Sequence, residues 1–165
     1  MKKIAPFILI AFLSGCANHS ALELFKKDEL FESAILQTKK ADIISSFETK
    51  AIINATYLNP IDKDFKSNES ETFLIGIYIT DDNKSDNANF LKNPTFKLSL
   101  NDKEVVSFKE IESTHKMYSH IPLKNSWAKY YEVKFPRDAK ETLLILKYEH
   151  QTFGHALIAF ESDYQ

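Results

Sequence analysis

From about residue 41 to the end of the chain, apolar and polar residues alternate in short runs, and this period of two constrains the fold more than any other feature. In 72–80, for example, Phe73, Ile75 and Ile77 fall on one side of an extended chain. The alternation predicts seven strands, at 49–58, 72–80, 96–100, 106–108, 131–135, 144–148 and 156–160. An eighth strand is expected if 41–45 is extended on its own.

No helical stripe of useful length separates these segments, so βαβ units are not expected. Short antiparallel strands with one apolar face each bury those faces when two sheets stack. The sequence therefore predicts a mainly β fold, an immunoglobulin-like antiparallel β-sandwich of seven or eight strands over 41–165. A closed barrel is the alternative. Cys16 is the only cysteine, so the core must hold this domain without a disulfide.

The beginning of the chain has the layout of an export signal. Lys2 and Lys3 precede an apolar run from Ala5 to Leu13, which is too short to span a bilayer. Leu13-Ser14-Gly15-Cys16 follows, and this motif resembles the lipobox of bacterial lipoproteins. The resemblance implies that 1–15 is a signal peptide, that cleavage occurs before Cys16, and that this cysteine carries the lipid.

The same resemblance implies a location in the bacterial cell envelope. Two or more acyl chains hold a protein firmly on a membrane, at about 0.8 kcal/mol per buried methylene. Ala17, rather than Asp, follows the cysteine, and the sorting rule of enteric bacteria then favours the outer membrane. The lipobox and the strand rhythm together are similar to those of small Ig-like lipoproteins of AT-rich bacteria, a resemblance that brings no functional residues.

Residues 16–40 are expected to form a lipid-anchored tether and one short helix. Ser20 and Glu23 have the spacing of a capping box, and Leu24, Phe31 and Ile35 fall on one helical face. Leu30 and Ala34 lie beside that face. The expected helix packs on the domain, and an interfacial membrane helix is the alternative, although its polar face mixes acidic and basic residues.

Charge excludes one class of partner. Cleavage would remove two lysines and leave 19 basic against 23 acidic residues, a net charge of −4. Arg137 is the single arginine, and no basic cluster is present to neutralise phosphates. Nucleic acid is therefore not an expected partner.

Four histidines suggest a metal site. If every connection reverses the strand direction, the loops beginning at Asp81, Glu112 and Gln151 share one end of the sandwich. His115, His120, His150 and His155 then lie near that end, as weak candidates for zinc or copper ligands. Solvated histidines are the alternative, since spacing alone fixes no geometry, and no cofactor is predicted.

Catalysis finds little support in the sequence. Gly76 and Gly154 are the only glycines after the leader, so neither a GxSxG elbow nor a Gly-rich phosphate loop is available. A hydrolytic enzyme is therefore the third hypothesis, after metal binding.

The first hypothesis is a non-catalytic binding or structural role in the envelope, with a protein partner contacting Met117, Tyr118 and Trp127 in the long loop after Glu112. The interpretation that we favour for these side chains is that Tyr118 and Trp127 fold back over the end of the core, because a sandwich needs its open ends covered.

Overall fold

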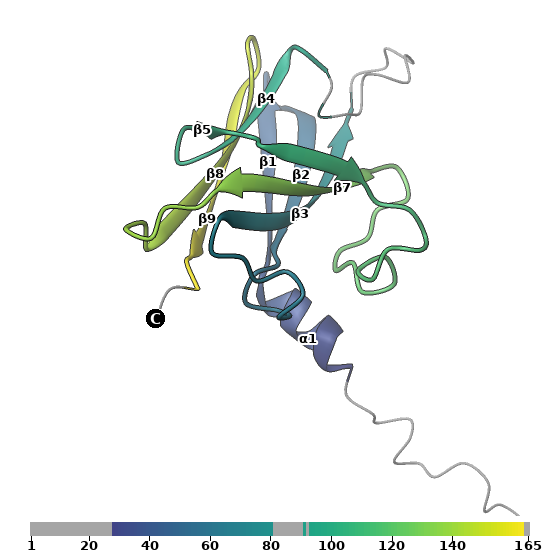
Figure 1. Ribbon diagram of the computed structural model, residues 1–165. Helices are drawn as coiled ribbons and strands as arrows, with labels where there is room; N and C mark the ends of the chain where they lie inside the picture. Colours follow the sequence, from purple (N-terminus) through teal and green to yellow (C-terminus); the bar gives the residue numbers. More distant parts are fainter. Residues whose placement is uncertain (1–27, 81–90, 92, 164–165) are drawn as a thin grey trace, which may run out of the picture.

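The computed structural model describes residues 28–80, 91 and 93–163. One short helix precedes two antiparallel sheets (Figure 1). The elements are α1 (Glu29–Leu36), β1 (Thr38–Ser45), β2 (Glu48–Tyr57), β3 (Ser70–Ile79), β4 (Phe96–Leu100), β5 (Lys103–Glu104), β6 (Ser107–Glu110), β7 (Lys129–Pro136), β8 (Leu143–His150) and β9 (Gly154–Glu161).

The two sheets form the β-sandwich that the alternation predicts. One sheet has the order β1-β2-β3-β7-β6 and the other has the order β5-β4-β8-β9. In the letters used for immunoglobulin domains, β2-β3-β7-β6 corresponds to A-B-E-D and β5-β4-β8-β9 to C′-C-F-G. The immunoglobulin-like sandwich is therefore confirmed, with β1 added outside the first strand of the usual order. The described residues form nine strands instead of the seven or eight expected, because the two-residue β5 is too short to show an alternation in the sequence.

The residues that share the apolar face of each strand are those that the core buries. Ala51, Ile53, Phe73 and Ile75 in the five-stranded sheet belong to one core with Leu146 and other residues of the four-stranded sheet, and these five residues are each at least 98% buried. The core between the sheets takes one face of each strand, so this part of the burial follows directly from the period of two. The other face of β3 is also buried, as Leu74 shows.

The two sheets meet along two lateral sides of the sandwich, and the contacts at these two sides differ. On one side β1 and β9 lie next to each other, and Lys39 Nζ donates a hydrogen bond to the carbonyl oxygen of Ala159 at 2.7 Å. On the other side the chain crosses from β5 to β6 through Val105 and Val106. Only Ser99 and Leu100 of β4 are paired with β5 on that side.

The face by which helix α1 was predicted to contact the domain is wrong. Asp28 is its N-cap, and Oδ1 of Asp28 accepts a hydrogen bond from the Phe31 N–H at 3.1 Å. The helix buries Ala34 and packs Leu30, whereas Phe31 and Ile35 are exposed. The reason is that the helix contacts the end of β2 and the loop after β6, which lie on its Leu30–Ala34 side. The predicted capping box at Ser20 lies outside the described residues.

Candidate functional site

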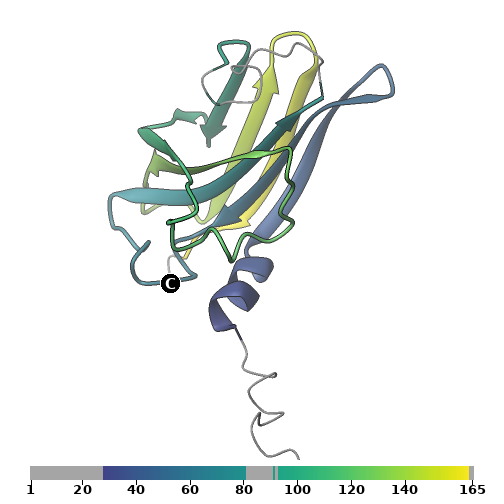
Figure 2. The same cartoon turned by 90° about the vertical axis from the view of Figure 1, so that its right-hand side faces the viewer.

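The long connection between β6 and β7, residues 111–128, is the candidate binding surface, and we call it the β6–β7 loop. It leaves from the end of the sandwich predicted for it, but it does not stay there. The loop folds back along the outer face of the five-stranded sheet toward α1 (Figure 2). It therefore covers a sheet face, and the expectation that it plugs the end of the main core is wrong.

A second hydrophobic core holds the β6–β7 loop in place. Side chains from the loop, α1, the β2–β3 connection and the outer face of the sheet meet there: Ala34, Leu58, Leu74, Ile111, Met117, Ile121 and Tyr130. Met117 is completely buried. Tyr130 adds a polar tie, because its hydroxyl oxygen accepts a hydrogen bond from the backbone N–H of Asn125 at 2.6 Å. A loop fixed by a core presents its outer residues in a defined arrangement.

Charged groups join the β6–β7 loop to the β2–β3 connection. Lys116 Nζ lies 2.7 Å from Oδ2 of Asp62 and 2.6 Å from Oδ2 of Asp64. The Asp64 backbone N–H and Lys116 together lower the pKa of Asp62. Lys116 and Asp64 are exposed and Asp62 is only partly buried, so these groups guide the position of the loop more than they stabilise the fold.

His115 is a structural residue of this loop. Its Nδ1 accepts a hydrogen bond from the Met117 N–H at 3.1 Å, so the ring proton of the neutral form is on Nε2. Nε2 then donates to Oε2 of Glu132 at 3.0 Å. The ring also stacks on Phe65, with centroids 6.4 Å apart. His115 therefore uses both nitrogens within the protein.

The structure does not bring the four candidate histidines together. His120 Nε2 lies 3.2 Å from Oδ2 of Asp28 at the start of α1, on the same outer face as His115. His150 stacks on Phe153 in the β8–β9 hairpin, which also carries His155. Among the described residues, no three His, Cys, Asp or Glu side chains are placed to hold a metal ion. The parity argument is wrong here because the β6–β7 loop folds away from the hairpin.

The three residues predicted to contact a partner have different environments. Met117 belongs to the second core and cannot contact a partner. Tyr118 is half-buried, and Lys124 Nζ lies 3.7 Å from the centre of its ring. Trp127 exposes 75% of its surface, and Leu123, which the sequence did not single out, exposes 62%. The loop thus displays two large apolar side chains outside both cores.

Sequence reasoning also missed a buried polar cluster at the α1 end of the sandwich, which we call the Arg137 cluster. It consists of Tyr57, Glu71, Arg137 and Asp163. The hydroxyl of Tyr57 donates to Oε2 of Glu71 at 2.6 Å and lies 3.0 Å from Oδ1 of Asp163. Arg137 pairs with both carboxylates and donates to the Ser67 carbonyl oxygen at 2.6 Å.

Burial decides the electrostatics of the Arg137 cluster. Removal from water raises the pKa of Glu71 above its ordinary value, even though Tyr57 and Arg137 both favour the charged form. Burial and the adjacent Glu71 carboxylate also raise the pKa of Tyr57. The one signal in the sequence was that Arg137 is the only arginine, but a single residue indicates neither its burial nor its partners.

The predicted lipidation site at Cys16 lies outside the described residues. Within the part of the chain that the structure describes, no helix is both long and apolar enough to cross a bilayer. Comparisons of the chain with protein-family models, with curated proteins and with solved structures find no match.

Proposed function

We propose that this protein is a lipid-anchored binding module of the bacterial cell envelope, with a non-catalytic role. In this proposal Cys16 carries the lipid, and the outer membrane is the favoured site. The β6–β7 loop contacts an envelope protein through Trp127 and Leu123. This revises the predicted contact residues, because Met117 is buried and is replaced in the proposal by Leu123.

The observation that carries the binding role is the exposure of Trp127 on an ordered loop. Most residues of the loop that are large and apolar enter the second core, and Ile111, Met117 and Ile121 are each at least 92% buried. Trp127 and Leu123 are left facing solvent although the loop around them is held by packing and hydrogen bonds. Trp is a favoured anchor residue of protein interfaces, since it buries a large area at a small cost in conformational entropy.

The anchor is supported by the leader alone. A short basic segment, an apolar run and Leu13-Ser14-Gly15-Cys16 occur in the order that lipoprotein export requires. Eleven residues then connect Cys16 to Asp28, and the twelve steps between these two residues span at most roughly 40–43 Å when extended. The proposal therefore keeps α1 and the adjacent β6–β7 loop close to the membrane.

Mass spectrometry of the protein from its native membrane tests the anchor. We expect an N-terminal peptide that begins at Cys16 and carries acyl chains. The Cys16→Ser variant is the control and should lack this peptide and leave the membrane fraction. An unmodified Cys16 thiol in the native protein would contradict the anchor.

Site-specific crosslinking tests the contact surface in cells. A photoreactive amino acid at position 127 should yield a discrete crosslinked product. The same residue at position 157 is the matched control, because Leu157 is also an exposed apolar residue, at 53%, but lies on the outer face of the four-stranded sheet. The protein identified in that crosslinked product should be recovered in smaller amounts with the Trp127→Ala variant than with the wild type. Crosslinking at position 157 with none at position 127 would contradict the assignment of the loop.

A further inference from the structure

We propose that the groove between β6 and β4 binds an extended peptide as an added β-strand, and that this peptide carries a large apolar residue flanked by acidic residues. The proposal concerns a different surface from the β6–β7 loop. It depends on neither the lipid at Cys16 nor a partner at Trp127.

The first observation is the free edge of β6. Ile111 N–H donates to the Tyr130 carbonyl oxygen at 2.9 Å, in register with the β6–β7 pairing. Hydrogen-bonded and non-hydrogen-bonded pairs alternate along an antiparallel ladder. The backbone N–H and C=O groups of Phe108 and Glu110 therefore point away from β7. Within the described residues, these groups have no backbone partner beyond β6.

The opposite wall of the groove is also an incomplete ladder. Asn101 N–H donates to the Ile145 carbonyl oxygen at 2.9 Å, which sets the phase of the β4–β8 pairing. By the same alternation, the backbone groups of Leu98 point toward the β5 side. Strand β5 is too short to reach Leu98, because it pairs only with Ser99 and Leu100. Two ladder edges thus border the groove, whereas β1 and β9 meet on the other lateral side.

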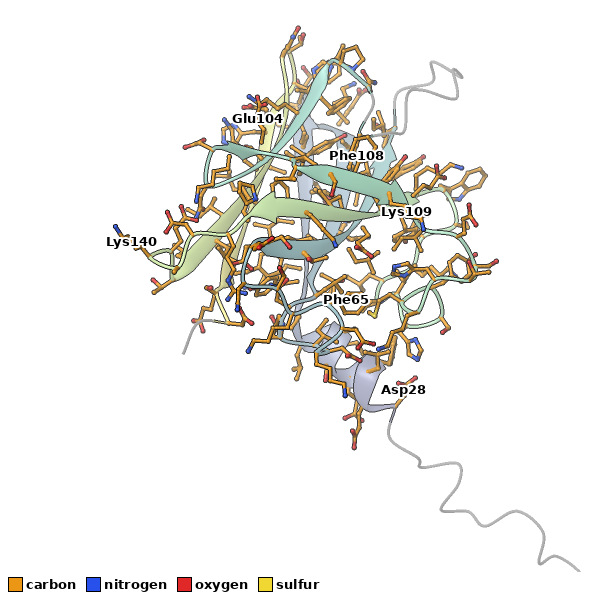
Figure 3. All side chains as sticks on the ribbon, viewed as in Figure 1. Asp28, Phe65, Glu104, Phe108, Lys109 and Lys140 are labelled. Atoms are coloured by element: carbon orange, nitrogen blue, oxygen red, sulfur yellow. The ribbon has the colours of Figure 1, made fainter. Side chains whose placement is uncertain are left out.

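The third observation is a pocket between these edges that is lined mainly by apolar residues. Its volume is about 400 Å³, and six of its eight lining residues are apolar, among them Leu98 and Phe108, whereas Lys97 and Glu104 are charged. This volume lies at the small end of the range for ligand sites and suits one large apolar side chain. Figure 3 shows Phe108 on β6 and Glu104 on the neighbouring β5. An added strand would direct every second side chain into this pocket, as in other complexes formed by strand addition.

Charge selects the residues that flank the apolar side chain. Lys109 is exposed, and no described carboxylate lies within 4.0 Å of its ammonium group as an ion pair. Side chains alternate along a strand, so the neighbours of the pocket residue lie on the Lys109 side of the added peptide. Acidic residues there are complementary to Lys109.

The same charge disfavours a second copy of this chain as the occupant. Antiparallel pairing of two β6 edges through both Phe108 and Glu110 places Lys109 directly opposite Lys109 of the other copy. Like charges directly opposite each other destabilise a strand pair. A lysine on a free edge is a common protection against such pairing.

Peptide binding to the full-length chain in detergent tests this proposal. The probe is a short, blocked, fluorescent peptide of β-branched residues with one central phenylalanine between two glutamates. We expect saturable binding by fluorescence anisotropy. Replacing the phenylalanine by serine, or the glutamates by lysines, should weaken binding at least about tenfold.

Two changes separate strand addition from simple occupation of the pocket. N-methylation of the peptide groups that face β6 removes hydrogen-bond donors and leaves the side chains unchanged. In the protein, Glu110→Pro removes the outward N–H, and edge strands tolerate proline at such positions. Glu110→Ala is the matched control because it keeps the N–H. Methylation and Glu110→Pro should each weaken binding about tenfold or more, and Glu110→Ala should not.

Amide hydrogen exchange detects the backbone hydrogen bonds between the peptide and the protein without a mutation. We expect the bound peptide to slow exchange at the N–H groups of Phe108, Glu110 and Leu98. The proposal is overturned if no peptide of the set binds, or if the N-methylated peptide binds equally well. It is also overturned if these amides are already protected in a concentration-dependent dimer, since a second copy would then fill the edge.

Discussion

Nε of Arg137 lies 3.2 Å from Oε1 of Glu71, and the two side chains expose only 3% and 1% of their surface. The pair connects the start of β3 to the end of β7. Asp163, just after β9, joins the same guanidinium. The Arg137 cluster therefore ties the two sheets and the C-terminal end of the described chain together.

Arg137→Met should be strongly destabilising. The change leaves the Glu71 and Asp163 carboxylates buried without their main cation, and loss of one partner from a buried pair costs about 3–5 kcal/mol. Urea unfolding should show this loss in the free energy of unfolding. Lys66→Met is the control, because Lys66 is 60% exposed and lies 3.8 Å from Oδ2 of the same Asp163. Its effect should be at most about 1 kcal/mol, and equal losses in both variants would contradict a special role of Arg137.

Glu71 should give the protein a pH-dependent stability term. Its pKa is raised by burial above the ordinary value of 4.5, so the folded state binds its proton more tightly than the unfolded state does. The stability of the wild type relative to Glu71→Gln should therefore fall as the pH rises from about 4.5 through the pKa of the folded protein, and then stay constant.

Unfolding free energies of both proteins, measured across this pH range, check the sign. The difference between them isolates Glu71 from the other carboxyl groups. If the stability of the wild type relative to Glu71→Gln rises with pH, then the pKa of Glu71 is lowered in the folded protein, and the interactions with Arg137 and Tyr57 outweigh the effect of burial.

Gly76 should not accept a larger residue. A Cβ atom built at this position lies 2.5 Å from Cε1 of Tyr130, the residue that pairs with Gly76 across β3 and β7. Gly76→Ala must displace the ring, whose hydroxyl is bonded to Asn125, so we expect a loss of about 1–3 kcal/mol. Gly76→Ala combined with Tyr130→Leu should recover part of it in a double-mutant cycle. Additive losses would contradict the contact.

The sandwich was predictable from the sequence because each strand carries its own apolar face. Phe73 and Ile75 alternate with residues of the other face whatever the partner strand is. The second core was not predictable in this way. Met117 and Ile121 lie in a loop without a period of two or 3.6, and their contacts with Leu58 and Ala34 depend on how distant segments fold together.

The candidate site shows the same limit. Sequence order placed the start of the β6–β7 loop at the correct end, but it gave no information on where a long loop would pack. The histidines were therefore grouped wrongly, and a buried Met117 was assigned to the surface. The free edge of β6 was also beyond prediction, since it results from β6 being the last strand of its sheet, with the short β5 paired to β4 in the other sheet.

Met117 and Trp127 should differ sharply in their contribution to stability. Met117→Ala removes a fully buried side chain from the second core, and such changes cost about 2–5 kcal/mol. Trp127→Ala removes an exposed side chain and should change the free energy of unfolding by at most about 0.5 kcal/mol. Chemical denaturation of the two variants measures both values. A large loss for Trp127→Ala would assign this residue to the fold instead of to a binding surface.

The β1–β2 hairpin offers a stabilising change. Ser46 and Phe47 form its two-residue turn with φ angles of 54° and 65°, the left-handed conformation that a type I′ turn requires. An aromatic residue is unfavourable there, and the Phe47 side chain is fully exposed, so it gains no packing in return. Phe47→Gly should raise the free energy of unfolding by about 0.5–1 kcal/mol, because the relief of strain exceeds the added freedom of the unfolded chain.

Phe47→Ala is the matched control, since it removes the ring but keeps a Cβ in the left-handed conformation, and it should change stability little. Thermal unfolding distinguishes the two, and an equal gain from both variants would show that the exposed ring, and not the backbone conformation, is the source of the cost.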